Sequence, residues 1–324
     1  MIISRTPLRV SFAGGGSDLS AYYLNEPGAV TSTAIDKYVY ITVNAKFDDR
    51  LRVSYSKTEI VDSPNDLTHE IVREALKLVG ISGGVEITSI ADIPSRGTGL
   101  GSSSSFTVGL LNALYAFTGK NVSAGRLARE ACEIEIEKVG EPIGKQDQYI
   151  AAYGGLQHIQ FNPDESVFVD PVICPYGVKE SLQEDLMLFY TGLTRKSSSI
   201  LTEQRENTGK RMGVLAEMVD LSKKIKASLS CGDLTEFGEL LDRGWVLKKK
   251  LASGISSEKI DKLYESAKRA GALGGKILGA GGGGFLLLYC EKRKQAAVKK
   301  RLSDLRYTPL SFEPQGSKII YVGD

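Results

Sequence analysis

Residues 94–105 read PSRGTGLGSSSS, and the interpretation of the whole chain starts from this stretch. The segment follows Val85–Ala91, a predicted strand, and leads into Ser102–Phe117, where apolar residues recur at helical spacing. Glycine lets backbone amides approach an anion closely, and the first turn of a helix has free N–H groups at the positive end of its dipole. One serine is enough for an ordinary helix cap, whereas four follow here in a row. We therefore predict that this segment binds phosphate groups.

The charge balance and the hydropathy pattern argue against two classes of partner. The 324 residues include 41 lysines and arginines and 39 aspartates and glutamates, which gives a formal net charge of +2. This balance gives no reason to expect nucleic acid or a membrane surface as a partner. The N-terminal segment lacks the apolar core of a signal peptide, and no run of about 18 apolar residues occurs. We expect a cytoplasmic protein, and the sequence leaves its oligomeric state open.

The cysteines and histidines restrict the metals that the chain can bind. Its four cysteines lie far apart without a CxxC pair, and only two histidines are present. A cysteine zinc site and a multi-histidine site are therefore both excluded. A bound metal would need oxygen ligands, and this requirement favours Mg²⁺ or a similar hard ion.

The order of predicted strands and helices differs between the two halves of the sequence. In the first half strands alternate with helices, and residues 34–43 form a predicted strand because β-branched and aromatic residues dominate them. Residues 171–179 contain two prolines and a glycine and are typical of a connection. We predict two domains, residues 1–175 and 176–324, the second of the α+β class with helices on one sheet face. The elements predicted for the second domain are a strand at 185–191, helices between 197 and 251, a helix at 258–270, a strand at 284–290, a helix at 292–305 and a strand at 317–322.

Two carboxylates stand out near a predicted helix at residues 124–139. Glu135 lies on the stripe of small apolar residues, where a carboxylate needs a partner or a metal unless it reaches water at the edge of the stripe. Asp147 lies in the polar stretch 144–149, where an ordinary turn or cap aspartate is the simpler interpretation. The remaining glutamates of the helix share a face that we expect to be solvated, namely Glu130, Glu133 and Glu137.

Two better-known nucleotide motifs do not fit. The P-loop pattern GxxxxGK[ST] is absent from the chain. Gly279, Gly281 and Gly284 spell GxGxxG, but a predicted strand follows them where a dinucleotide-binding site needs a helix. The phosphate-binding prediction therefore depends on residues 94–105.

Three glycine-rich segments, in this order, resemble the motifs of the GHMP kinase superfamily (galactokinase, homoserine kinase, mevalonate kinase and phosphomevalonate kinase). They are PLRVSFAGGGSD at residues 7–18, PSRGTGLGSSSS at residues 94–105 and KILGAGGGGF at residues 276–285. The resemblance covers essentially the whole chain. It implies an α+β two-domain GHMP kinase fold, with a ribosomal-S5-like N-terminal domain, a ferredoxin-like C-terminal domain and the site between them.

The resemblance also implies roles for the two carboxylates. A magnesium-binding glutamate seven residues before a proline corresponds to Glu135, since Pro142 follows at that distance. The partner serine corresponds to Ser103, with Ser102 and Ser104 as alternatives. The proposed catalytic aspartate corresponds to Asp147, and Arg9 would keep it ionised or stabilise charge on the transferred group. The ATP phosphates would contact Gly97, Gly99, Leu100, Gly101, Ser102, Ser103, Ser104 and Ser105.

Departures from the family pattern narrow the range of possible substrates. Galactokinases have a Glu-His pair where this chain has Gly15-Gly16, so galactose is disfavoured. The GGGSD segment, with TAIDKY at residues 33–38, is most similar to D-glycero-D-manno-heptose 7-phosphate kinases, and fucokinases are a near relation. The implied reaction is ATP-dependent phosphorylation of the anomeric hydroxyl, which gives the 1,7-bisphosphate. The residues expected to bind the sugar phosphate are Gly15, Gly16, Ser17, Asp18, Arg195, Lys196, Ser197, Gly282 and Gly283.

The cluster TRKSSS at residues 194–199 supports a phosphorylated substrate. Its two cations and three hydroxyls at a predicted helix start suit an existing phosphate, although a helix cap with solvated basic residues also fits. Three alternatives remain open: another sugar 1-kinase such as a fucokinase, an isoprenoid or homoserine-type kinase, and a catalytically dead sensor of sugar and ATP. The GGGSD segment disfavours the second alternative, and the presence of both Glu135 and Asp147 argues against the third.

Overall fold

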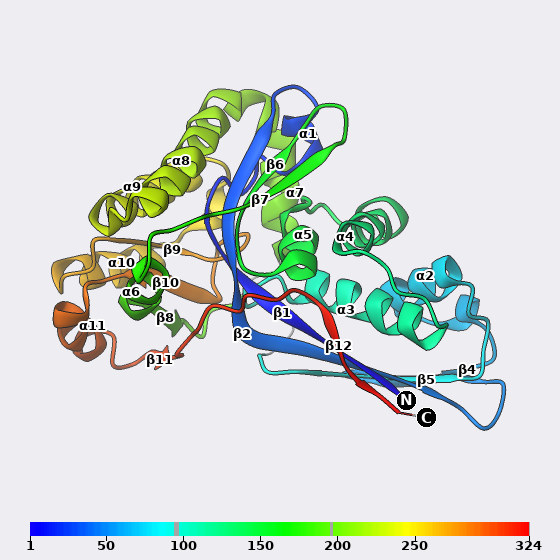
Figure 1. The fold of residues 1–324 in the computed structure, drawn as a ribbon. Coiled ribbons are helices and arrows are strands. Elements are labelled where there is room, and N and C mark those ends of the chain that lie inside the picture. Colours follow the sequence, from blue (N-terminus) through cyan, green and yellow to red (C-terminus); the bar gives the residue numbers. More distant parts are fainter. Residues whose placement is uncertain (94–96, 195–196, 324) are drawn as a thin grey trace.

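The computed structural model describes residues 1–93, 97–194 and 197–323, which form two sheets with helices packed around them (Figure 1). The larger sheet has eight strands in the order β12-β1-β2-β5-β3-β4, and β6 and β7 extend it from β2. Its strands are β1 Ile2–Ala13, β2 Gly28–Ala45, β3 Leu51–Ser54, β4 Thr58–Val61, β5 Val85–Ala91, β6 Leu156–Phe161, β7 Val167–Pro171 and β12 Lys318–Val322. The helices of this part are α1 Ser20–Tyr23, a 3₁₀ turn Pro64–Asp66, α2 Glu70–Val79, α3 Ser102–Phe117, α4 Ala124–Cys132, a π-helix Glu133–Lys138 and α5 Gln146–Tyr153.

The smaller sheet has four antiparallel strands in the order β11-β8-β10-β9. Its strands are β8 Leu186–Tyr190, β9 Gly274–Ile277, β10 Phe285–Tyr289 and β11 Arg306–Tyr307. The helices of this part are α6 Val178–Asp185, α7 Ser197–Asn207, α8 Met212–Cys231, α9 Leu234–Lys248, α10 Glu258–Arg269 and α11 Gln295–Arg301, with 3₁₀ turns at Thr208–Arg211, Ser253–Ile255 and Lys292–Lys294. The mixed α+β character expected from the sequence is confirmed, and β5 and α3 have the predicted bounds.

The long hairpin of β1 and β2 organises the larger sheet. Residues 28–33 of β2 pair with β6, whereas residues 39–45 of the same strand pair with β5. The register of β1 against β2 shifts between Pro7 and Leu8, so the hairpin changes course in its middle. Helices α2, α3, α4 and α5 lie over one face of this sheet (Figure 1). This arrangement brings the middle of β1 against the start of α3 and the start of α5.

The last strand differs from the sequence-based expectation. We expected residues 317–322 to complete the second domain, but β12 pairs antiparallel with β1, with Ile3 opposite Tyr321. The two ends of the chain therefore lie side by side at the edge of the larger sheet (Figure 1). A local pattern predicts that a segment is a strand but not which edge it joins, since any open sheet edge offers the same N–H and C=O groups. The division at residue 175 thus leaves one strand of the first sheet in the second domain.

The glutamate-rich helix also departs from expectation. The α-helix ends at Cys132 and continues as a π-helix, in which the Val139 N–H donates to the Ile134 carbonyl five residues back. Helical spacing over six residues cannot separate these two forms, and π-helices occur frequently at functional sites. Glu130, which we expected to be solvated, is buried and accepts hydrogen bonds from Tyr115 Oη (2.8 Å) and Arg126 Nε (2.7 Å).

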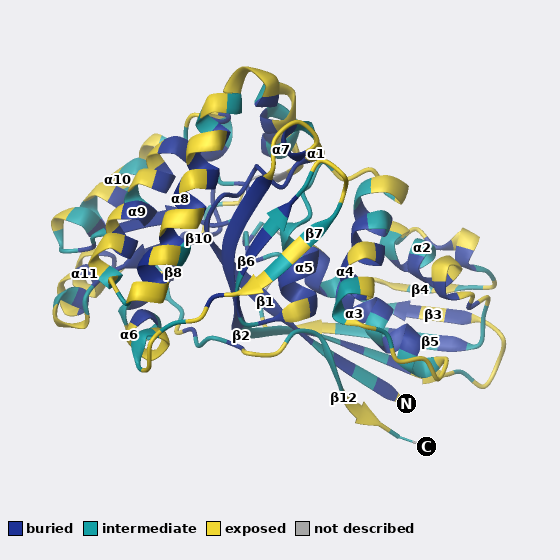
Figure 2. Ribbon diagram, turned by 45° about the horizontal axis from the view of Figure 1, so that its top comes forward, coloured by how far each residue is buried: buried dark blue, intermediate teal, exposed yellow. Residues whose placement is uncertain are grey.

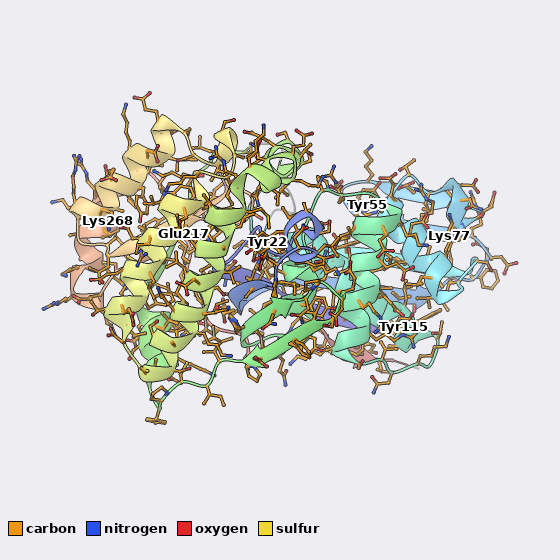
Figure 3. The ribbon with its side chains drawn as sticks, turned by 90° about the horizontal axis from the view of Figure 1, so that it is seen from above. Tyr22, Tyr55, Lys77, Tyr115, Glu217 and Lys268 are labelled. Atoms are coloured by element: carbon orange, nitrogen blue, oxygen red, sulfur yellow. The ribbon has the colours of Figure 1, made fainter. Side chains whose placement is uncertain are left out.

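The two sheets share a packed interface. Phe12 on β1 contacts Phe237 on α9 edge to face, with ring centroids 5.1 Å apart, while α9 also packs on β9. Buried residues concentrate on β1, β2 and β10, and the outer faces of α8 and α9 are exposed (Figure 2). Tyr22 is buried near the middle of the molecule, whereas Lys77 and Glu217 lie on its outside (Figure 3). Within the described ranges, no helix has both the length and the apolar character needed to cross a membrane.

A buried polar cluster joins α8 to the larger sheet. Thr31 Oγ1 on β2 lies 3.0 Å from His158 Nδ1 on β6 and donates to the Ser222 carbonyl on α8 at 2.9 Å. His158 is 5% exposed, and its burial lowers the pKa to about 4 because the charged imidazolium loses its hydration. The folded state therefore contains neutral His158 at neutral pH.

We expect acid to destabilise the protein through His158. The unfolded chain protonates this residue near pH 6.5 and the folded chain near pH 4, so the free energy of unfolding falls as the pH drops through that window. In His158→Gln this contribution is removed, and the variant should lose less stability than the wild type between pH 7 and pH 4.5. Urea unfolding midpoints at several pH values measure the difference. The same acid sensitivity in both proteins would contradict the assignment.

Candidate active site

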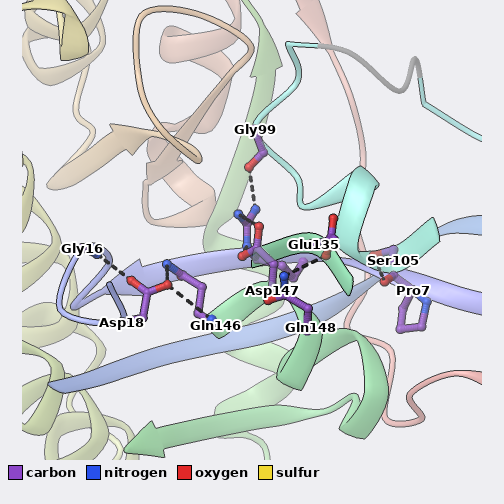
Figure 4. A network of polar contacts seen from close by, with 10 residues as sticks. Pro7, Gly16, Asp18, Gly99, Ser105, Glu135, Gln146, Asp147 and Gln148 are labelled. Atoms are coloured by element: carbon purple, nitrogen blue, oxygen red, sulfur yellow. Dashed lines mark hydrogen bonds and ion pairs between the residues drawn. The ribbon is translucent and has the colours of Figure 1, made fainter. Parts of the chain in front are cut away.

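Arg9 on β1 joins the parts of the candidate site. Its Nε and Nη2 donate to the two carboxylate oxygens of Asp147, each at 2.7 Å, and its Nη1 donates to the Gly99 carbonyl at 2.5 Å (Figure 4). Its backbone N–H donates to the Leu100 carbonyl at 3.0 Å. One side chain therefore holds the first motif, the glycine–serine loop and the first turn of α5 together. Burial raises the pKa of Asp147, and the Arg9 guanidinium counteracts this by favouring the ionised form.

The glycine–serine loop has the backbone form of an anion site. Gly97, Gly99 and Gly101 have φ values of 71°, 76° and 76°, which residues with a Cβ rarely adopt. Gly101 precedes α3, and no described side chain caps this helix, so the N–H groups of its first turn remain available. The side chain of Leu100 is fully buried, and any contact with a phosphate must come from its backbone.

The serines at the start of α3 differ in their surroundings. Ser103 is exposed, and its hydroxyl donates to Glu135 Oε1 at 2.7 Å. The other three serines are buried, and Ser105 Oγ donates to the Pro7 carbonyl at 2.8 Å, which fixes α3 to β1. Ser103 is thus the serine that combines exposure with a contact to Glu135.

Glu135 is fully buried in the π-helix, as its place on the apolar stripe suggested. It accepts hydrogen bonds from Ser103 and from Gln148 Nε2 at 2.7 Å, and none of the ion pairs found among the described residues includes it (Figure 4). Burial raises the pKa of Glu135 to about 7 because the carboxylate lacks a compensating cation. A carboxylate beside a hydroxyl is a suitable donor set for a hard divalent cation, so the residues fit Mg²⁺.

The third motif packs directly on the loop. A Cβ on Gly99 would lie 2.3 Å from the Leu278 carbonyl oxygen, and a Cβ on Gly279 would lie 2.6 Å from the Gly99 Cα. These glycines therefore permit backbone contact between the two domains. Gly282 and Gly283, which we expected to bind substrate, lie elsewhere: the Gly282 N–H donates to the Ile255 carbonyl at 2.8 Å, and neither glycine lines the cavity described next.

A small polar cavity of about 70 Å³ opens beside Asp147. Gly15, Gly16 and Asp18 line it, as the sequence suggested. Asp18 accepts from the Gly16 N–H at 2.8 Å and from Gln146 Nε2 at 2.9 Å, so it fixes the glycine turn to the start of α5 (Figure 4). Ser17 was also expected here, but its buried hydroxyl donates to the Gly14 carbonyl and stabilises the turn.

Buried polar residues that the sequence does not single out complete the cavity. Lys248 donates to the Gly15 carbonyl at 3.2 Å, and Lys276 donates to the Phe12 carbonyl at 3.2 Å. Burial lowers the pKa of Lys248 to about 8 and that of Lys276 to about 7. Lys276 belongs to the third motif, and this position could have identified it as a site residue. Lys248 is the first of three consecutive lysines at residues 248–250, a pattern typical of a solvated surface. The other such residues are Ser11 and Gln204.

Part of the predicted binding cluster for the sugar's phosphate lies outside the described residues. Arg195 and Lys196 lie outside the described residues, and so does the side chain of Ser197, the first residue of α7. Leu201 and Gln204, one and two turns further along α7, line the cavity.

Known families match both parts of the chain. The family described as GHMP kinases N terminal domain matches residues 66–155, and that described as GHMP kinases C terminal matches residues 218–307. These regions contain the π-helix, α5 and the third motif.

Individual relatives agree with this match. The chain is 28% identical to a D-glycero-alpha-D-manno-heptose 7-phosphate kinase from Campylobacter jejuni, and the similarity covers 93% of each protein. It is 27% identical to an L-fucokinase/L-fucose-1-P guanylyltransferase from Bacteroides fragilis, over 93% of this chain but 36% of that longer protein. Among solved structures, a D-glycero-D-manno-heptose 1-phosphate kinase from Bacteroides thetaiotaomicron has the same fold, with a TM-score of 0.83, 24% identity and full coverage of both chains.

We expect Glu135→Gln to change stability in opposite directions without and with Mg²⁺. In EDTA at pH 8 the buried Glu135 of the wild type is charged, whereas at pH 4.5 it is neutral in the folded protein. The variant should therefore be more stable than the wild type by at most about 3 kcal/mol at pH 8 and by little at pH 4.5. In Mg²⁺ with an ATP analogue, the wild type should gain thermal stability and the variant should not.

Glu130→Gln is the matched control for this measurement. Glu130 is also a buried glutamate, but it pairs with Arg126 and Tyr115 and lies away from Ser103. Its substitution should lower stability equally with and without Mg²⁺. An equal Mg²⁺ effect in the Glu135→Gln and wild-type proteins would contradict the metal assignment. Differential scanning fluorimetry is sufficient for every comparison.

Proposed function

Because this chain belongs to the GHMP kinase family and is a sugar kinase that uses ATP, we propose that it phosphorylates the anomeric hydroxyl of D-glycero-D-manno-heptose 7-phosphate to give the 1,7-bisphosphate. The observation that supports the chemistry best is the position of Asp147. Its carboxylate is paired with Arg9, lines the polar cavity and lies beside Gly101 at the start of α3, where a Cβ would be 3.2 Å from Asp147 Oδ2. The similarity over 93% of a heptose 7-phosphate kinase supports the substrate.

The loop and its neighbours form the proposed nucleotide site. The phosphates of ATP would lie against the backbone of Gly97–Ser105 and the start of α3, where free N–H groups and the helix dipole favour anions. Ser103 and Glu135 would hold Mg²⁺, which when bound neutralises charge on the phosphates. The buried Lys248 of the cavity adds positive charge nearby.

Asp147 would orient the sugar and accept its proton. In the proposed step the anomeric oxygen forms a bond to the γ-phosphorus, the bond from that phosphorus to the β,γ-bridging oxygen breaks, and ADP leaves. The proton of the anomeric hydroxyl passes to Asp147. The paired guanidinium of Arg9 orients this carboxylate, because both of its oxygens accept hydrogen bonds from one rigid group.

The existing phosphate of the heptose would be bound at the start of α7. Arg195, Lys196 and Ser197 supply two cations and a hydroxyl there by sequence. The helix begins at Ser197 and Leu201 lines the cavity, so the helix start lies about 6 Å along the axis from a cavity residue. L-Fucose, which has no phosphate, is the second candidate because the fucokinase relative is 27% identical over 93% of this chain.

A substrate panel tests the proposal, and Asp147→Asn tests the mechanism. We expect ADP release from the wild type with heptose 7-phosphate and little with L-fucose, galactose or mevalonate. We expect Asp147→Asn to bind ATP normally and to lower kcat roughly 100-fold or more, since it removes the proton acceptor but retains the shape. Asp170→Asn, an exposed aspartate on β7, is the control and should retain full activity.

Each alternative has its own outcome in the same assay. If L-fucose is the preferred substrate, the proposed heptose substrate is wrong but the assignment of the active site stands. ATP binding without ADP release for any sugar would identify a sensor and overturn the proposal. Near-normal turnover by Asp147→Asn would remove Asp147 from the mechanism.

A further inference from the structure

Three buried polar atoms around the cavity have no hydrogen-bond partner among the described residues. They are Ser11 Oγ, Gln146 Oε1 and Gln204 Nε2, and all three belong to residues that line the same cavity. Buried polar atoms are almost always paired, so three such atoms on one small cavity point to a polar occupant of that cavity. The set combines a hydroxyl, an acceptor and a donor, which suits the adjacent hydroxyl groups of a sugar.

Gln204 is the member of this set that comes from the second domain. It lies on α7, is 2% exposed, and its Oε1 accepts from Lys248 Nζ at 3.2 Å. An ammonium group only donates hydrogen bonds, so Lys248 must face the oxygen of the amide and not its nitrogen. This contact fixes the orientation of the amide, and it leaves both N–H groups of Nε2 without an acceptor among the described residues.

The first motif leaves space for this amide. A Cβ on Gly16 would lie 2.3 Å from Gln204 Nε2, and Gly16 has a φ of 112°, so a larger residue here would displace the amide. Lys248 also donates to the Gly15 carbonyl, which ties the same turn to α9. The glycine pair of the first motif and Gln204 of the second domain therefore form one arrangement, although 188 residues separate Gly16 from Gln204.

We propose that Gln204, oriented by Lys248, donates a hydrogen bond to a hydroxyl oxygen of the bound sugar and thereby determines which sugar is accepted. Ser11 on β1 and Gln146 on α5 contact neighbouring hydroxyls. The inference rests on the proposed function to the extent that a sugar occupies this cavity. It adds that recognition needs both domains, since the donor comes from α7 and the catalytic carboxylate from α5.

Gln204→Leu and a set of monodeoxy sugars test this proposal. With the best substrate of the panel, we expect the variant to lower kcat/KM for the sugar about 10-fold to 100-fold and to leave the KM for ATP unchanged, because an unpaired buried sugar oxygen replaces a hydrogen bond. The wild type should discriminate about 10-fold or more against one monodeoxy analogue. Gln204→Leu should lose that discrimination and retain it at the other positions.

Two further variants separate recognition from structure. Gln204→Glu retains an oxygen toward Lys248 but has no donor, so it should lose the same discrimination while its thermal stability remains near that of the wild type. Gln157→Leu is the matched control: Gln157 is also a glutamine with an unpaired buried Oε1, but its Nε2 donates to the Gly154 carbonyl and it does not line the cavity. This control should retain the wild-type pattern.

The outcomes distinguish this inference from the proposed function. If the wild type phosphorylates no sugar, the proposed function fails and this inference fails with it. If the wild type is active but Gln204→Leu and Gln204→Glu discriminate among the deoxy analogues as it does, only the role of Gln204 is overturned. Equal losses of activity toward every analogue, together with lower thermal stability in both variants, would assign Gln204 a purely structural role.

Discussion

The ion pair of Arg9 with Asp147 is the interaction on which the rest of the site depends. Arg9 uses three N–H groups of its side chain and its backbone N–H to contact α5 and the glycine–serine loop at once. Arg9 lies on β1 opposite Ala34 of β2, so the position of the guanidinium is set by a paired strand and not by a loop. A rigid, planar donor with a fixed geometry is suited to this task, because lysine could not make the paired contact.

Two buried ionisable groups of the site, Glu135 and Lys276, are unfavourable for the stability of the protein without bound ligands. Burial raises the pKa of Glu135 to about 7 and lowers that of Lys276 to about 7, so both groups lie close to losing their charge near neutral pH. Neither group has a charged partner within 4 Å among the described residues. Such an arrangement costs stability when the site is empty, and proteins retain it where bound ligands supply the opposite charges. A metal ion for the glutamate and phosphates for the lysines would meet that requirement.

The sequence predicts the local elements, and singles out the two candidate carboxylates, better than it predicts the contacts between distant segments. Glu135 could be recognised because a carboxylate on an apolar stripe is chemically unusual, and the family resemblance alone pointed to Asp147. The pairing of β12 could not be predicted because it depends on residues more than 300 positions away. Helical spacing over six residues does not separate a π-helix from an α-helix, and the pattern of one helix does not show that Glu130 packs against Tyr115 of α3. Gln204 and Lys248 gave no signal, since single glutamines and lysines on charged helices are normally exposed. For Gly282 and Gly283 substrate contact stays a prediction, because the sequence does not tell whether a glycine serves backbone packing or ligand binding.

The position of β12 also affects how the molecule is made. The outer edge of β1 near Ile3 is completed by residues 318–322, which are synthesised after the helices and strands of the second domain. Until then the strand that carries Arg9 has an open edge that other strands can occupy. Closing it requires contact between residues more than 300 positions apart, which is entropically costly and slow. The nucleotide-binding part of the enzyme therefore cannot reach its final form on the ribosome while the second domain is still being translated.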